Sequence, residues 1–193
     1  MLMSIFDHKT IDQHVQELDE HIQHELNIQN TLAGCLSPGA TILESLDPEM
    51  AINKLKSMLQ PDYQVLGSGL EAEWLLKQQG RPVIRWDVKT FRKNDAVGSM
   101  YKLAKLPKDP KCVIIVENIT EIPEAISEIY DDPILVENVL LHSWKNDTIH
   151  LTHWQDGPFE LNRQDYSVIF PIRPGELKKL HFSVKGEIAM VRL

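Results

Sequence analysis

The sequence predicts an α/β protein built around a parallel β-sheet that helices cover on both faces. From about residue 61 onward, short apolar segments alternate with segments of helical character, which is typical of parallel strands joined by helical crossovers. The segment from Lys111 to Val116 is apolar after its first residue, as expected for a strand buried on both faces. With 42% hydrophobic and 25% charged residues, the 193-residue chain has the composition of an ordinary globular domain.

The first part of the chain predicts a long amphipathic helix. Residues 8–33 carry large apolar side chains at spacings of three and four, which place them on one side of a helix. This apolar stripe consists of Ile11, Val15, Leu18, Ile22 and Leu26. The segment from Gly34 to Thr41 is rich in Gly, Ser and Pro, and we expect a loop that lets the helix reach away from the α/β body.

A second helix is expected over residues 48–60. Asp47 is a suitable N-cap. Pro48 suits the first helical position because the backbone N–H that proline lacks would make no hydrogen bond within the helix at that position. We therefore expect a helical N-terminal arm at residues 1–60 and an α/β domain at residues 61–193.

The α/β part predicts its elements in a regular order. Strands are expected at residues 63–66, 82–88, 111–116, 148–154, 158–162 and 165–172, with one or two more within 181–193. Helices are expected at residues 70–79 and 95–106 and within 123–144. The two segments on either side of Gln155-Asp156-Gly157 predict a β-hairpin, because Asp-Gly is a turn signal.

The charge of the chain narrows the class of partner. A net charge of -8 and a pI of about 5.5 argue against nucleic acid or an anionic membrane as the main partner, since both favour clustered Lys and Arg. The first residues lack a basic segment followed by an apolar run, and no segment has the length of a membrane span. We expect a cytoplasmic protein without a signal peptide.

No metal site is expected from the cysteines or the histidines. Cys35 and Cys112 are far apart and lack metal-ligand spacing, which fits a reducing compartment. Three histidines and one glutamate at spacings of three and four on the first helix could bind a transition metal. This set is His14, Glu17, His21 and His24. The alternative is a solvated helix face, and this is the reading that we expect.

A glycine loop follows the strand at residues 63–66. Gly67, Ser68 and Gly69 lie between that strand and a helix, which is the layout of a phosphate site at a helix N-terminus. No lysine stands at the helix start, and Glu71 and Glu73 place negative charge in its first turn, where they would repel a triphosphate. The alternative is a plain turn between strand and helix.

The second candidate site is Glu117-Asn118, directly after the buried strand. A carboxylate at this point can hold Mg²⁺, and a following acid can orient an attacking water. Asn118 can position a water but cannot accept its proton. The alternative is that both residues cap the helix that follows, with help from Thr120 and Glu121.

Taken in order, residues 62–175 resemble the core of an AAA+ ATPase of the MoxR-like type. YQVLGSGLEAEW stands where that family has its Walker A strand, loop and helix, and PVIRWDV stands at its second strand. KCVIIVENITEIP stands at the Walker B position. ILVENVLLHSWKNDTIHLTHWQDGPFELNRQDYSVIFPIRPG resembles the family's helix, β-hairpin and sensor strand. The resemblance implies a sheet of P-loop NTPase type with a β-hairpin insertion.

The resemblance also implies degenerate ATPase motifs. The Walker A lysine and hydroxyl residue are missing, and the Walker B acid pair is replaced by Glu117-Asn118. Phe170 and Pro171 stand where the family has a polar sensor residue. We expect no counterpart of the family's helical lid domain.

From these features we expect a non-catalytic AAA+-like binding or assembly subunit of a larger complex, without catalytic residues or cofactor. Its expected contact surfaces are the apolar stripe and Trp154 at the hairpin tip, and its partner is another protein or a second copy. One alternative is an atypical ATP-binding or ATP-hydrolysing protein that uses Gly67, Ser68, Gly69, Glu117 and Asn118. The other is an inactive accessory subunit of a nucleic-acid-processing machine.

Overall fold

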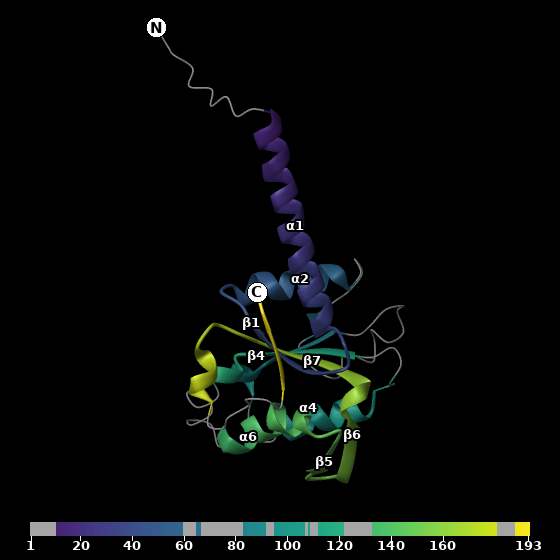
Figure 1. Cartoon of the computed structure of the whole chain (residues 1–193). Coiled ribbons are helices and arrows are strands. Elements are labelled where there is room, and N and C mark those ends of the chain that lie inside the picture. The colour runs from purple at the N-terminus through teal and green to yellow at the C-terminus, as the bar shows by residue number, and fades with distance from the viewer. Residues whose placement is uncertain are drawn as a thin grey trace.

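The protein folds around a parallel β-sheet that lies between two layers of helices (Figure 1). The computed structural model describes residues 11–59, 65–66, 83–91, 95–106, 108, 112–121, 133–180 and 188–193. Within these residues, six strands form one sheet in the order β2-β3-β4-β7-β1-β8, and every neighbouring pair is parallel. The strands are β1 (Gly39–Glu44), β2 (Val65–Leu66), β3 (Val83–Asp87), β4 (Cys112–Glu117), β7 (Tyr166–Ile172) and β8 (Ala189–Arg192). The predicted α/β class with a parallel sheet is confirmed.

Helices cover both faces of the sheet, which explains why its central strands are apolar throughout. The first face carries α1 (Ile11–Cys35) and α2 (Pro48–Met58), and the second carries α4 (Asp95–Ala104) and α6 (Pro133–Leu140) (Figure 1). Successive side chains of a strand point to opposite faces. In β4, Ile115 accordingly joins the α1 and α2 layer, whereas Ile114 joins the α4 and α6 layer.

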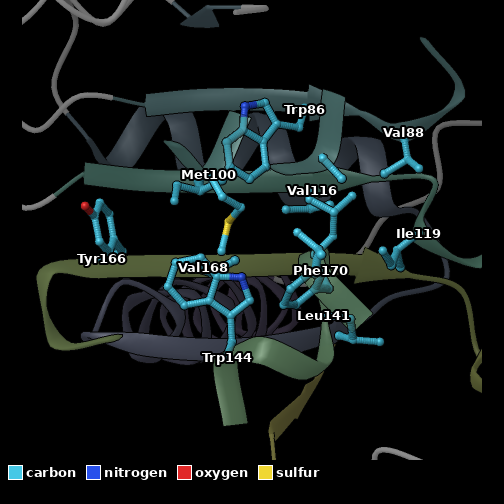
Figure 2. Packing of buried hydrophobic residues seen from close by; sticks show 14 of the residues in the cluster. Trp86, Val88, Met100, Val116, Ile119, Leu141, Trp144, Tyr166, Val168 and Phe170 are labelled. Carbon is cyan, nitrogen blue, oxygen red and sulfur yellow. The ribbon is translucent and has the colours of Figure 1, made fainter. Parts of the chain in front are cut away.

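The larger core lies between the sheet and the α4 and α6 layer. Figure 2 shows Trp86, Met100, Trp144 and Phe170 filling this space. Tyr166 lies in the same layer, where its hydroxyl donates to the carbonyl oxygen of Leu103 at 3.0 Å, and burial raises the pKa of Tyr166. These side chains pack α4 and α6 against the sheet, and the candidate site described below lies at the carboxyl ends of its strands.

The prediction for the segment from Gly34 to Thr41 is wrong in its second half. Residues 39–44 are not a loop but β1, which lies inside the sheet between β7 and β8. Gly39 adopts φ 118°, which L residues rarely adopt, and so turns the chain directly into the strand. Ile42 and Leu43 are then fully buried, each on its own face.

This strand also changes the domain organisation that we expected. A boundary between residues 60 and 61 would assign a central strand to the N-terminal arm, whereas residues 39–59 belong to the α/β body. The hydrophobic cluster on this face joins Leu43 of β1 and Leu55 of α2 to Ile115 and Ile169 of the sheet. In the part of the chain that the structure describes, the N-terminal portion of α1 extends beyond this body (Figure 1).

Several other predicted elements are confirmed. Asp47 caps α2 by accepting a hydrogen bond from the Met50 N–H at 3.0 Å, and Pro48 begins the helix. The hairpin forms from β5 (Thr148–His153) and β6 (Gly157–Asn162), which pair antiparallel and make a sheet of their own. The predicted glycine loop and the helix at residues 70–79 lie outside the described residues. No helix in the described part of the chain is long and apolar enough to cross a membrane.

Candidate functional site

A crevice of about 380 Å³ opens at the carboxyl ends of β1, β3, β4 and β7, beside the start of α2. The connection after β1 leads to α2 on one face, whereas those after β3 and β4 lead to α4 and α6 on the other. In open α/β sheets, ligands bind outside the carboxyl ends of strands where the connections diverge in this way. The crevice is therefore the position in this fold where a small-molecule site is expected.

The crevice is acidic, and several of its charged side chains already contact other groups of the protein. Six carboxylates and three cationic side chains line it. The carboxylates are those of Asp47, Glu49, Asp87, Glu117, Glu121 and Glu176, and the cations are Arg85, Lys89 and Arg173. Carboxylates thus outnumber cations in the lining, and several of them accept hydrogen bonds from neighbouring side chains or backbone N–H groups.

Glu117 forms an ion pair with Arg85, from the neighbouring strand β3. The Arg85 Nε donates to Glu117 Oε2, and the side chains of the two residues are 32% and 12% exposed. A terminal nitrogen of Arg85 lies 3.4 Å from Glu49 Oε2, at the start of α2. The hydrogen bond to Glu117 raises the pKa of Arg85. Because a guanidinium already neutralises this carboxylate, a divalent cation would have to displace Arg85 before Glu117 could bind it.

Asn118 forms a second link to β3. It adopts φ 58°, which Asn tolerates better than most residues, and its side-chain amide donates to Asp87 Oδ1 at 2.7 Å. The same Asp87 oxygen accepts the backbone N–H of Lys89 at 3.1 Å. The Lys89 ammonium lies 2.6 Å from Glu121 Oε2. The side chains of Glu117 and Asn118 thus tie β4 to β3, which neither the metal-site nor the helix-cap interpretation predicted.

The N-terminus of α2 is the helix end that faces the crevice. A phosphate there would need free N–H groups and a positive helix end. Asp47 already accepts the Met50 N–H, Pro48 has no N–H, and Glu49 adds negative charge to the first turn. The loop between β1 and α2, Ser45-Leu46-Asp47, contains neither glycine nor lysine. This helix end is therefore satisfied by the protein's own carboxylates.

The residues of α1 considered as an alternative metal site form no such site in the described part of the chain. Those residues contain no group of three or more His, Cys, Asp or Glu side chains that could hold a metal ion. His14, Glu17, His21 and His24 lie exposed along α1. Gly67, Ser68 and Gly69, which the alternative nucleotide site would use together with Glu117 and Asn118, lie outside the described part of the chain.

The apolar stripe lies on the exposed part of α1. Its side chains are exposed by 82% (Ile11), 54% (Val15), 58% (Leu18), 43% (Ile22) and 44% (Leu26). The body-facing side of the helix begins at Glu25, whose carboxylate lies 2.6 Å from the Lys54 ammonium of α2, and continues to the buried Leu32 and Cys35. Figure 1 shows α1 rising from the α/β body along most of its length.

Trp154 lies at the hairpin turn and is 54% exposed, as the sequence predicted. Its indole covers Gly98 of α4, where a Cβ atom would come within 3.2 Å of Trp154 Cη2. The neighbouring His153 stacks on Tyr101 of α4, with ring centroids 4.3 Å apart. The exposed Trp154 is therefore held in place by α4 as well as by its own hairpin.

The sequence reading missed Arg85 and Asp87 as partners of Glu117 and Asn118. One signal was available, because Arg85 interrupts the apolar strand VIRWD, and a charged residue in a buried strand needs a paired carboxylate. The pairing of β3 with β4, which brings Asp87 opposite Glu117, was needed to identify that carboxylate.

Comparison with protein-family models, with curated proteins and with solved structures finds no match for this chain.

Proposed function

We propose that this protein is a non-catalytic AAA+-like binding or assembly subunit that contacts its partner through the apolar stripe of α1. The observation that carries this proposal is the exposure of five large apolar side chains in one row on a helix that leaves the body. Exposed apolar surface of this kind marks interaction sites in folded proteins. A helix end with so little packing surface of its own is also marginal in water, so a partner would stabilise it.

The crevice supports the non-catalytic part of the proposal. Catalysis of phosphoryl transfer depends on cations and N–H groups that are free to receive the phosphates. Here the Arg85 guanidinium is engaged by Glu117 and Glu49, and the start of α2 is engaged by Asp47. A triphosphate would meet a surplus of carboxylates and would have to break these contacts.

We also propose that the sheet is a degenerate P-loop NTPase scaffold with the hairpin as an insertion. The parallel sheet and the carboxylate at the end of β4 support this resemblance. Among the described residues, the strand–loop–helix unit that borders the crevice is β1 with α2. This unit lacks the glycines and lysine of a working P-loop. Cys35 and Cys112 are buried and form no disulfide, which supports a cytoplasmic location.

Thermal unfolding with and without millimolar MgATP tests the proposal against the nucleotide alternative. A ligand at 100 times its dissociation constant adds about 2.7 kcal/mol to the free energy of unfolding. We expect no change in melting temperature. A clear rise that is lost in Glu117→Gln would overturn the non-catalytic reading and favour an atypical ATP-binding protein.

The contact surface is tested by the double variant Val15→Asp with Ile22→Asp. We expect light scattering to show a smaller assembly, while circular dichroism shows a folded α/β body, because both residues lie beyond the helix segment that packs on α2. The matched control is Gln16→Asp with Gln23→Asp, which adds the same charges on another face of α1. Loss of the whole fold in the stripe variant alone would show that the stripe belongs to the intramolecular core.

A further inference from the structure

We infer that the apolar stripe pairs with α1 of a second copy of this chain, in a parallel two-stranded coiled coil. The inference rests on the proposed function, in which α1 is the contact element, and it specifies the occupant and its direction. Three observations carry it: the residue types along the stripe, the position of the stripe relative to the body, and the charges beside it.

The residue types along the stripe fit two parallel strands. With Val15 and Ile22 at positions a of a heptad, Ile11 and Leu18 fall at positions d. Parallel dimers favour β-branched residues at a and leucine at d. Val15 and Ile22 are both β-branched and Leu18 lies between them, so the centre of the stripe carries the residue types that parallel dimers favour.

The stripe faces away from the surface that α2 covers. At 3.6 residues per turn, the stripe and the body-facing residues Ile28, Leu32 and Cys35 lie about a third of a turn apart around the helix axis. Glu25 would occupy the next position d, but its carboxylate is held by Lys54 of α2 at 2.6 Å. The seam, formed by the a and d residues from Ile11 to Ile22, therefore ends where the contact of α1 with the body begins. A second helix can lie along it without displacing α2.

The charges beside the stripe favour a parallel direction. Lys and Arg are absent from α1, and the helix is acidic because it contains Asp12, Glu17, Asp19, Glu20 and Glu25. Two copies therefore repel each other unless acidic residues of one helix face residues without negative charge on the other. His14 falls at position g and Asp19 at position e of the next heptad. Residues at e and g lie beside one another across a parallel pair and set its direction. His14 of one copy then faces Asp19 of the second copy, whereas an antiparallel pair would bring the two Asp19 carboxylates to the same side.

Disulfide trapping of the full chain tests the occupant and the direction together. Ile11→Cys places a thiol at one end of the stripe, where only a parallel pair brings the two copies of residue 11 together. Cys35 and Cys112 are buried, and burial raises the pKa of Cys35 to about 11, so the new thiol is the reactive one. We expect a disulfide-linked dimer from Ile11→Cys and none from the control Gln16→Cys, which points away from the seam.

Charge exchange tests the pairing of His14 with Asp19. His14→Glu should weaken the dimer about threefold to tenfold in sedimentation experiments, because it opposes two pairs of like charges across the seam. Adding Asp19→Lys should restore it. Gln23→Glu adds the same charge beside Asp19 and Glu20 of its own helix but away from the seam, and it should change the dissociation constant little.

A wild type that stays monomeric up to about 1 mM would overturn the inference, since dimers weaker than this fall below the usual range of specific association. A dimer that forms the disulfide only when Ile11→Cys is mixed with Ile22→Cys would overturn the parallel direction. If the wild type is a monomer and MgATP does not change its melting temperature, the stripe does not bind a second copy, but the proposal of a non-catalytic protein is unaffected. Stabilisation by MgATP refutes that proposal, whatever the oligomeric state.

Discussion

The ion pair between Arg85 and Glu117 should contribute more to stability than any exposed ion pair near the crevice. Replacing Arg85 with Met removes the guanidinium and leaves the Glu117 carboxylate, whose side chain is 12% exposed, without its cation. Breaking a fully buried pair on one side costs about 3–5 kcal/mol, and an exposed pair is worth about 0.2–1 kcal/mol. With Arg85 itself 32% exposed, water can reach part of the site, and we expect a loss between these limits, about 2 kcal/mol.

Urea unfolding followed by circular dichroism measures this loss. For a chain of this length, about 2 kcal/mol corresponds to a fall in melting temperature of about 4–8 °C. Glu117→Gln should cost less, about 1 kcal/mol, because the amide oxygen can still accept from Arg85. The double variant Arg85→Met with Glu117→Gln should lose less than the sum of the single losses, since no buried carboxylate is left unpaired.

The control is Lys89→Met, which removes a cation from a more exposed pair. Lys89 and Glu121 have side chains 48% and 34% exposed, so we expect a loss of no more than about 1 kcal/mol. If Arg85→Met costs no more than Lys89→Met, or if the double variant is strictly additive, then Arg85 and Glu117 are not coupled and the pairing described for the crevice is wrong.

Three further outcomes are expected. The hydrogen bond from Lys54 lowers the pKa of Glu25 despite partial desolvation. The contact should therefore stabilise the C-terminal part of α1 at pH values above the ordinary pKa of the carboxyl group, and this stabilisation should be lost as the pH falls through the lowered pKa. If an acid titration of α1 followed by NMR gives the same curve for the wild type and for Glu25→Gln, the prediction is wrong. Cys35, with its pKa raised to about 11 by burial, should resist alkylation at pH 9 until urea unfolds the chain; rapid labelling of the native protein would refute its burial. Gly98→Ala should shift the fluorescence emission of Trp154, because the new Cβ comes within 3.2 Å of the indole; an unchanged spectrum would show that the ring does not rest on α4.

Local patterns in the sequence were enough to predict most of the elements. Continuous apolar character identified β4, and the Asp47-Pro48 pair identified the start of α2, because capping and burial on two faces depend on neighbouring residues. The strand β1 was missed because its buried core is short and directly follows a Gly and Pro segment that indicates a loop. The crevice could be predicted only in part: Glu117 was identified, but Arg85 and Asp87 reach it through strand pairing, which is a long-range property.

The side chains of the crevice contact other groups of the same chain, whereas those of the apolar stripe are exposed to solvent. In the crevice, Glu117 already contacts Arg85 and Asn118 already contacts Asp87, so a ligand would have to replace these contacts and would gain little binding free energy. Along α1, the exposed fractions of the four residues at positions a and d, Ile11, Val15, Leu18 and Ile22, amount to just over two full side chains, worth about 1.5–3 kcal/mol each when buried, or about 4–7 kcal/mol per helix. A pair of helices gains about twice that, and association costs an estimated 4–15 kcal/mol. The net is small, so dimerisation through two heptads should be weak, in the micromolar to millimolar range, and sedimentation should show it to depend on concentration. A dimer that persists at nanomolar concentration would mean that surfaces beyond the stripe, such as the hairpin around Trp154, contribute to the contact.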